Sequence, residues 1–175
     1  MSILKVARMG HPVLRQRSRP LEKSELLSPA FQGLIDDLLE TMHEYAGVGL
    51  AAPQVHESVR LFVALLEEEP AASARATVVV NPEIVPNTTV KGEGWEGCLS
   101  IPDIRGLVPR FTDVTLKALD RDGRAVELRL RDFPARVAQH EADHLDGVLF
   151  FDRMSSMESL TYLEEYSRFH GKDGD

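Results

Sequence analysis

Apolar residues in two stretches of this chain recur every three or four positions, the spacing that places them on one face of a helix. The first stretch follows Ser28-Pro29, a pair typical of a helix start, and predicts a helix over residues 29–46 that ends before Gly47. The second predicts a C-terminal helix from about Ser156 to Phe169. The polar residues 171–175 that follow it should form a frayed tail.

A third helical pattern lies between these two and carries polar residues on its apolar face. It begins at Asp132-Phe133-Pro134, where Asp132 has the side chain of an N-cap, and Gly147 provides a stop. The residues that recur at helical spacing are Phe133, Val137, His140, Glu141, His144 and Leu145. The pattern predicts a helix whose buried face includes two histidines and a carboxylate.

Short extended segments replace the helical spacing after Gly47. Arg60–Leu66 and Thr77–Val80 are rich in apolar residues and predict strands, of which the second should stop at Asn81-Pro82. The residues Glu67–Pro70 between them predict a solvated loop. A clearer signal follows, because apolar and polar residues alternate on both sides of an Asp-Arg-Asp-Gly turn at residues 120–123. We expect an antiparallel hairpin there with one face on the core.

Length and charge narrow the range of functions. A chain of 175 residues suits a single domain over residues 1–175, and its longest apolar run, Leu61–Leu66, is too short to cross a bilayer. Residues 1–5 have no signal-peptide pattern, so we expect a cytoplasmic protein. The formal net charge of −8, without a dense basic tract, argues against nucleic-acid binding as the main role, DNA included.

The residues Gln139–His144 carry the strongest chemical signal. His140 and His144 are four residues apart on one helix face, so both rings can bind a single divalent ion, and Glu141 lies beside them. Two such ligands and a neighbouring base are typical of metal-assisted hydrolysis. The alternative is a chance match on a surface helix, but the apolar face that the histidines share favours a metal site. A catalytic site of this kind needs a third protein ligand and an open position.

Two further stretches offer groups that such a site needs. Cys98, the only cysteine, lies in Glu96–Ser100 and is the best candidate for the third ligand, since a thiolate binds borderline-soft divalent metals well. A small buried hydrophobic residue is the alternative for a lone cysteine. In Gly47–Gln54 the small residues let a substrate approach the backbone, and Gln54 could donate to a developing oxyanion. Taken alone, that stretch would be an ordinary turn.

These three stretches, in this order and at these separations, closely resemble the signature motifs of peptide deformylases. The resemblance extends from Gly10-His11-Pro12-Val13-Leu14 through Asp146-Gly147. It implies an α+β domain that removes the formyl group from the N-formylmethionine of new polypeptides. With the patterns above, we expect antiparallel β-sheets packed around a central metal-binding helix, with a helix in the N-terminal half and another at the C-terminus.

Carried over residue by residue, the resemblance assigns roles to the site. Cys98, His140 and His144 would bind the metal, which such enzymes usually hold as Fe²⁺ in the cell, with Zn²⁺, Ni²⁺ or Co²⁺ as replacements in purified protein. Glu141 would be the general acid and base. The oxyanion hole would consist of the side chain of Gln54 and the backbone N–H of Leu99.

Two kinds of substrate contact are expected near the metal. Gly49 would offer its backbone to an extended peptide, and a pocket for the methionine side chain would be lined by Val48, Phe133 and Val137. Core packing is the alternative for the last two. Arg105, seven residues after Cys98, matches a family arginine that would hold Glu96 by an ion pair.

Some features leave alternatives open. Acidic residues predominate at the C-terminus, so docking on the ribosome through this helix, which a basic helix provides in some deformylases, is doubtful here. A metallopeptidase with the same metal ligands would need a longer cleft, for which the chain is short. A non-catalytic, metal-stabilised binding module would need a fourth protein ligand, and no obvious one lies near the motifs. A related enzyme with another acyl preference also fits the sequence.

Overall fold

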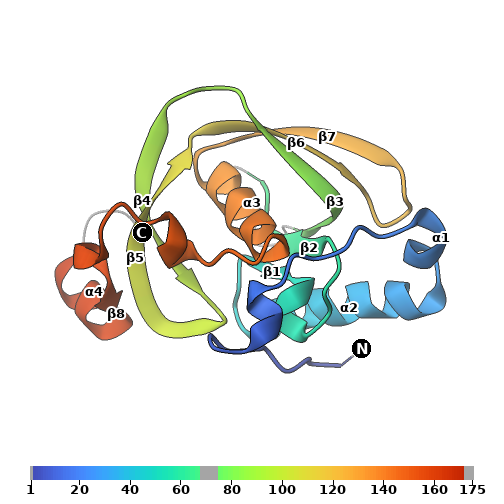
Figure 1. The fold of residues 1–175 in the computed structure, drawn as a ribbon, viewed down its shortest axis with the longest axis horizontal. Coiled ribbons are helices and arrows are strands. Elements are labelled where there is room, and N and C mark those ends of the chain that lie inside the picture. The colour runs from blue at the N-terminus through green and yellow to red at the C-terminus, as the bar shows by residue number, and fades with distance from the viewer. Residues whose placement is uncertain (1, 68–74, 172–175) are drawn as a thin grey trace.

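The computed structural model describes residues 2–67 and 75–171 of the chain (Figure 1). Within them, no helix is long and apolar enough to cross a membrane. The helices are Lys23–Leu26 (α1), Pro29–Glu44 (α2), Asp132–Leu145 (α3) and Leu163–Phe169 (α4), with 3-10 turns at Pro12–Arg15, Ala52–Val55, Phe150–Arg153 and Met157–Ser159. The strands are Gly49–Ala51 (β1), Leu61–Ala64 (β2), Thr77–Pro86 (β3), Lys91–Cys98 (β4), Ile101–Phe111 (β5), Asp113–Leu119 (β6), Ala125–Arg131 (β7) and Thr161–Tyr162 (β8).

The larger sheet is antiparallel and has the strand order β1-β2-β3-β6-β7. Its last two strands are the hairpin that the alternation of apolar residues predicted, and Leu116 pairs with Leu128 across it. Strand β1 is at the opposite edge, so one side of its backbone faces away from the sheet. This edge strand carries Gly49.

A second sheet of order β4-β5-β8 lies on the other side of α3, which occupies the middle of the molecule (Figure 1). The sequence did not predict β4 and β5, because glycines and charged residues interrupt the apolar alternation over residues 91–98. Antiparallel sheets around a central helix confirm the expected α+β fold.

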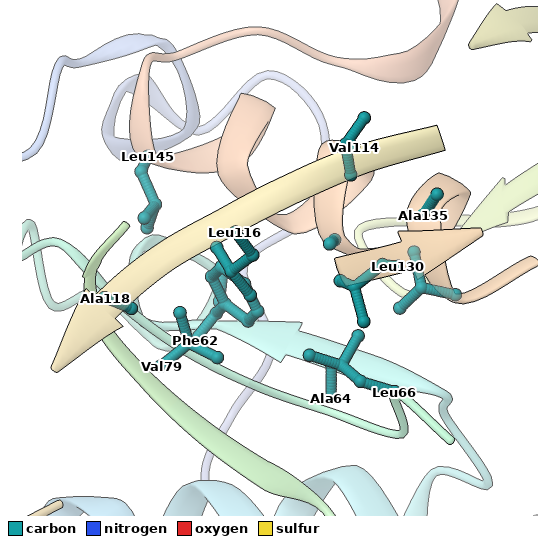
Figure 2. Packing of buried hydrophobic residues seen from close by; sticks show 13 residues of the cluster. Phe62, Ala64, Leu66, Val79, Val114, Leu116, Ala118, Leu130, Ala135 and Leu145 are labelled. Atoms are coloured by element: carbon teal, nitrogen blue, oxygen red, sulfur yellow. The ribbon is translucent and has the colours of Figure 1, made fainter. Parts of the chain in front are cut away.

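One face of α3 packs into the larger sheet. Ala135, Val137 and Ala138 of the helix are buried against Phe62, Leu116 and Leu130 of the strands, most of which Figure 2 displays. On the other side of the sheet, Ile35, Leu38 and Met42 of α2 pack against Leu50 and Leu61. The apolar stripe of the predicted helix 29–46 is therefore core, and its Ser28 caps the first turn by accepting a hydrogen bond from Phe31 N–H.

Two expectations about element ends were wrong. Strand β3 does not stop at Asn81-Pro82, because a bulge between Val80 and Glu83 lets the strand continue to Pro86. Asp132 is not a side-chain cap; it has a φ of +47°, and the cap position at Arg131 has no side-chain hydrogen bond. The reason is that the chain enters α3 directly from β7, by a sharp turn at Asp132.

The C-terminal helix is also shorter than predicted. It begins at Leu163 instead of near Ser156, because Thr161 and Tyr162 form β8 and pair with Arg105 and Ile104 of β5. Two further expectations fall partly outside the described residues. These parts are residues 68–70 of the expected solvated loop and residues 172–175 of the expected frayed tail.

Candidate metal centre

Three side chains from two elements converge at the centre of the molecule. His140 and His144 lie on successive turns of α3, and Cys98 is the last residue of β4. One potential ligand atom from each lies within 4.8 Å of the others, and Cys98 Sγ is 3.3 Å from His144 Nε2. The pairing of β4 with β5 brings the cysteine to the helix, a contact that spans 46 residues of sequence between Cys98 and His144.

The donor set fits a divalent transition-metal ion. Bond lengths of about 2.3 Å to sulfur and about 2.0 Å to nitrogen place tetrahedral ligand atoms about 3.5 Å apart, close to the sulfur–nitrogen distance of 3.3 Å. The thiol also accepts hydrogen bonds from the backbone N–H of Ser100 at 3.4 Å and from the Gln54 amide at 3.5 Å, both of which favour a thiolate. Burial alone would raise the pKa of Cys98, but the two histidines hold it well below its ordinary value.

Glu96 fixes the orientation of His140. Its Oε2 lies 2.9 Å from His140 Nδ1, and because a carboxylate can only accept, Nδ1 carries the proton and Nε2 is left for the metal. Arg110 donates to both carboxylate oxygens of Glu96 at 2.9 Å. Burial alone would raise the pKa of Glu96, but the hydrogen bonds from His140 and Arg110 outweigh it and lower the pKa to about 2.

Glu141 lies in the same centre without a hydrogen-bond partner for one of its oxygens. The side chain is buried, and within the described part of the chain its Oε2 has no partner. Burial raises the pKa of Glu141 to about 6, and the neighbouring histidines oppose that rise. A buried carboxylate with a free acceptor and a pKa near neutrality is suited to proton transfer.

A hydrogen bond to its side-chain oxygen fixes the orientation of Gln54, and the amide nitrogen points toward the metal group. Oε1 accepts a hydrogen bond from Ala51 N–H at 2.8 Å, and Nε2 donates to Ser100 Oγ at 3.2 Å as well as to Cys98 Sγ. The side chain is buried and is thereby fixed in one direction. Leu99, the other expected oxyanion donor, follows Cys98 in the turn between β4 and β5.

A cavity of about 710 Å³ opens beside these groups. Every site residue that the sequence predicted lines this cavity, except His144, which lies deeper. Phe133 is 54% exposed and therefore is not a core residue, whereas Val137 is buried both in the core and at the cavity wall. Val48 is also exposed at the cavity.

The expected ion pair between Arg105 and Glu96 is absent from the described residues. Glu96 pairs instead with Arg110 and with Arg136, whose Nη1 lies 2.8 Å from Glu96 Oε1. Arg105 donates to the carbonyl of Ile104 and lies so close to Gly97 that a Cβ there would be 2.0 Å from its Nη1. The reason is strand alternation: Glu96 is opposite Gly106, so Arg110 on the same buried face of β5 reaches it. Arg105 lies on the other face, and Arg136 comes from α3.

Sequence reasoning missed two arginines and one aspartate behind the metal group. Arg110 links Glu96 to Asp143, and Arg136 donates to the carbonyls of Gly92, Gly94 and Val108. A signal for Arg110 was present, because it occupies the inward face of an alternating strand, where a charged residue requires a buried partner.

The sequence model of the polypeptide deformylase family matches residues 3–160. The chain belongs to the peptide deformylase family. Peptide deformylase 2 of a Nostoc species is 43% identical in an alignment of 175 residues that covers 98% of this chain and 97% of that protein. Deformylases remove the N-formyl group from nascent polypeptides, and this chain is accordingly a metal-dependent hydrolase of formylated new chains.

Solved deformylases have the same fold. A class I type b peptide deformylase from Acinetobacter baumannii matches with a TM-score of 0.82 and 42% identity over 88% of this chain and 100% of that chain. The same enzyme with bound Met-Ala-Ser matches with a TM-score of 0.81 and 41% identity over 87% and 99%.

Proposed function

We propose that the deformylase reaction of this chain takes place where Cys98, His140 and His144 together hold one divalent ion. The observation that carries the proposal is the convergence of these three donors beside the buried carboxylate of Glu141, whose Oε2 has no hydrogen-bond partner among the described residues. The ion is Fe²⁺ in the cell, and Zn²⁺, Ni²⁺ or Co²⁺ can replace it in purified protein. A thiolate ligand makes an iron(II) site sensitive to oxygen.

Glu141 transfers the proton in this reaction. When held by Cys98, His140 and His144, the ion would supply a Lewis acid for the formyl oxygen and would lower the pKa of a nearby water. Glu141 accepts a proton from the attacking water, since a pKa of about 6 leaves its carboxylate ionised at neutral pH. The same carboxyl group then gives the proton to the amine nitrogen of methionine as the bond to the formyl carbon breaks.

Gln54 and Leu99 stabilise the developing oxyanion. The Gln54 amide is already oriented by its hydrogen bond with Ala51, so it donates without reorganising, and the backbone N–H of Leu99 adds a second donor. Removing one such donor typically costs about 3 kcal/mol of barrier.

The substrate peptide lies along the free edge of β1. Gly49 presents its backbone there, and pairing through main-chain groups accepts different residues after methionine. The methionine side chain occupies the part of the cavity lined by Val48, Phe133 and Val137. Residues 1–175 act as one catalytic domain in this scheme.

Since its substrates are newly made chains, we expect the enzyme to act near ribosomes in the cytoplasm. Docking through the C-terminal helix is not part of the proposal, because Glu164 and Glu165 occupy the first turn of α4 and would repel RNA.

Anaerobic purification followed by metal analysis and formate release from formyl-Met-Ala-Ser tests these roles. The wild-type protein should contain one ion per chain and release formate, whereas Glu141→Ala should keep the ion and lose nearly all activity. Normal turnover by that variant would refute its role as the base. An unformylated internal peptide serves as the control for the competing metallopeptidase reaction.

A further inference from the structure

Three basic side chains at the catalytic cavity have no acidic partner among the residues that the structure describes. Lys5, Arg8 and Arg105 line the cavity. Over residues 2–67 and 75–171, every arginine forms an ion pair with an aspartate or glutamate except Arg8, Arg75 and Arg105. Lys5 has no such pair in these ranges either. Two of the three unpaired arginines therefore face the site of the reaction.

This distribution differs from the charge of the molecule as a whole. The chain has a formal net charge of −8, so carboxylates are plentiful and most arginines are paired with them. Unpaired cations beside a cavity attract anionic groups, and the low-dielectric walls strengthen their field.

The backbone beside Arg8 and the side chain of Arg105 both lie against segments that carry the site residues. The residues that flank Arg8 are fixed, because Ala7 N–H donates to the Gln54 carbonyl at 2.7 Å and Met9 N–H donates to the Ser100 carbonyl at 2.8 Å. Arg105 lies against Gly97, the residue before Cys98. Both arginines are therefore attached to parts of the chain whose position relative to the metal group is fixed.

Acidic residues of the cavity do not cancel this charge. Glu96 is already paired with Arg110 and Arg136, and Glu141 is buried next to the histidines. Asp103 is the remaining carboxylate of the described cavity wall, and it is exposed at the rim. Three basic groups thus oppose one acidic group at the mouth.

We propose that Lys5, Arg8 and Arg105 make this deformylase select formylated chains with aspartate or glutamate soon after the methionine. The proposal rests on the proposed function, which places the formyl group beside Glu141, so that the following residues leave through the mouth. A peptide is favoured over nucleic acid as the anionic ligand because the three cations line the same cavity as the proposed catalytic groups, where the formylated chain binds.

The test compares formyl-Met-Glu-Glu-Ala with formyl-Met-Lys-Lys-Ala and formyl-Met-Ala-Ser. At about 50 mM salt, kcat/KM should be roughly tenfold higher for the acidic peptide than for the basic one, mainly through KM, and the ratio should approach one at about 0.5 M salt. Lys5→Gln and Arg8→Gln should each lower the ratio about threefold. Asp103→Asn should raise it, since the substitution removes the opposing charge.

Arg75→Gln provides the matched control, because Arg75 is exposed, has no ion pair with any residue that the structure describes, and does not line the cavity. A loss of preference in this variant equal to that of Arg8→Gln would assign the effect to net charge and overturn the proposal. Equal kcat/KM for all peptides at low salt would also overturn it while leaving deformylation intact. If a short single-stranded oligonucleotide inhibits the wild type more than Arg8→Gln and the peptides do not differ, the cations bind nucleic acid instead. Absence of formate release from every peptide would contradict the proposed function itself.

Discussion

A Cβ atom at Gly49 would lie 2.3 Å from Oε1 of Glu141, so this glycine leaves the space that the carboxylate occupies. Because Gly49 belongs to β1 and Glu141 to α3, the edge strand and the metal helix meet at the proposed base. A side chain at residue 49 would have to displace the carboxylate, since the backbone of a buried strand cannot move away.

Gly49→Ala should therefore lower kcat about 100-fold, the usual effect of a misplacement of about 1 Å in a catalytic group. Metal content should stay unchanged, because Glu141 is not a ligand in the proposed site. Gly33→Ala is the control: it lies in α2 with nothing within 4 Å of the added atom, and it should raise the free energy of unfolding by up to about 1 kcal/mol without affecting activity. Full activity of Gly49→Ala would show that Glu141 tolerates displacement.

Stability in acid should depend on Glu96. The pKa of Glu96 is about 2 in the folded chain, below its ordinary value of 4.5. Its contribution to the free energy of unfolding is therefore complete above about pH 4.5 and is lost as the pH falls through about 2. This difference corresponds to about 3 kcal/mol. Urea unfolding of metal-stripped protein from pH 5 to pH 2 should show this loss for the wild type and a smaller one for Glu96→Gln. Parallel curves would mean that Glu96 titrates alike in the folded and unfolded states.

The sequence predicted the elements whose patterns are local. The helices at residues 29–46 and 132–145 and the hairpin of β6 and β7 follow from apolar spacing, since each buries one continuous face. Strands β4 and β5 were missed because their pairing, with Arg136 inserted beside Gly94, compensates for poor strand propensity, and no local pattern reports such a contact.

The candidate site likewise has residues that the sequence predicted and contacts that it did not. His140 and His144 were predicted from their spacing on one helix face and Cys98 from the ligand chemistry of a thiolate, the resemblance implied the same set, and the structure brings the three together. The partner of Glu96 was wrongly predicted because Arg105 and Arg110 lie on the same strand, and only the register of β4 with β5 decides which one reaches the carboxylate.

Gln54 offers a test of the oxyanion hole. Gln54→Ala should lower kcat by a factor of about 100 to 1,000, because it removes a fixed donor from the transition state. Ser100→Ala removes only one acceptor of the Gln54 amide and leaves the hydrogen bond from Ala51 N–H, so its loss should be about tenfold or less. Steady-state kinetics with metal analysis and urea unfolding of both variants separates this effect from lost ligation or folding. Equal losses in kcat would indicate that Gln54 mainly supports the turn.

Arg136 should be among the most important residues for stability outside the apolar core. Its guanidinium donates to Gly92 O and Val108 O at 2.7 Å and to Glu96 at 2.8 Å, and it thereby ties the β4–β5 hairpin to α3. Arg136→Ala would leave these groups unpaired in a largely buried setting, so the free energy of unfolding should fall by about 3 kcal/mol. Gly94→Ala should have a smaller effect of the same sign, since its Cβ would lie 2.8 Å from the guanidinium carbon.

Arg124 provides the contrast for this prediction, because its ion pair with Asp122 lies on the surface. Arg124→Ala should change the free energy of unfolding by less than about 0.5 kcal/mol. If Arg136→Ala changed the free energy of unfolding as little as Arg124→Ala, the carbonyls of β4 and β5 would have to find other donors when the guanidinium is removed. The hairpin would then be held on the metal helix by its apolar contacts alone. Urea unfolding at neutral pH and the bound-metal content of the three variants distinguish these cases. A loosened hairpin would also move Cys98 away from His140 and His144 and would lower the metal content.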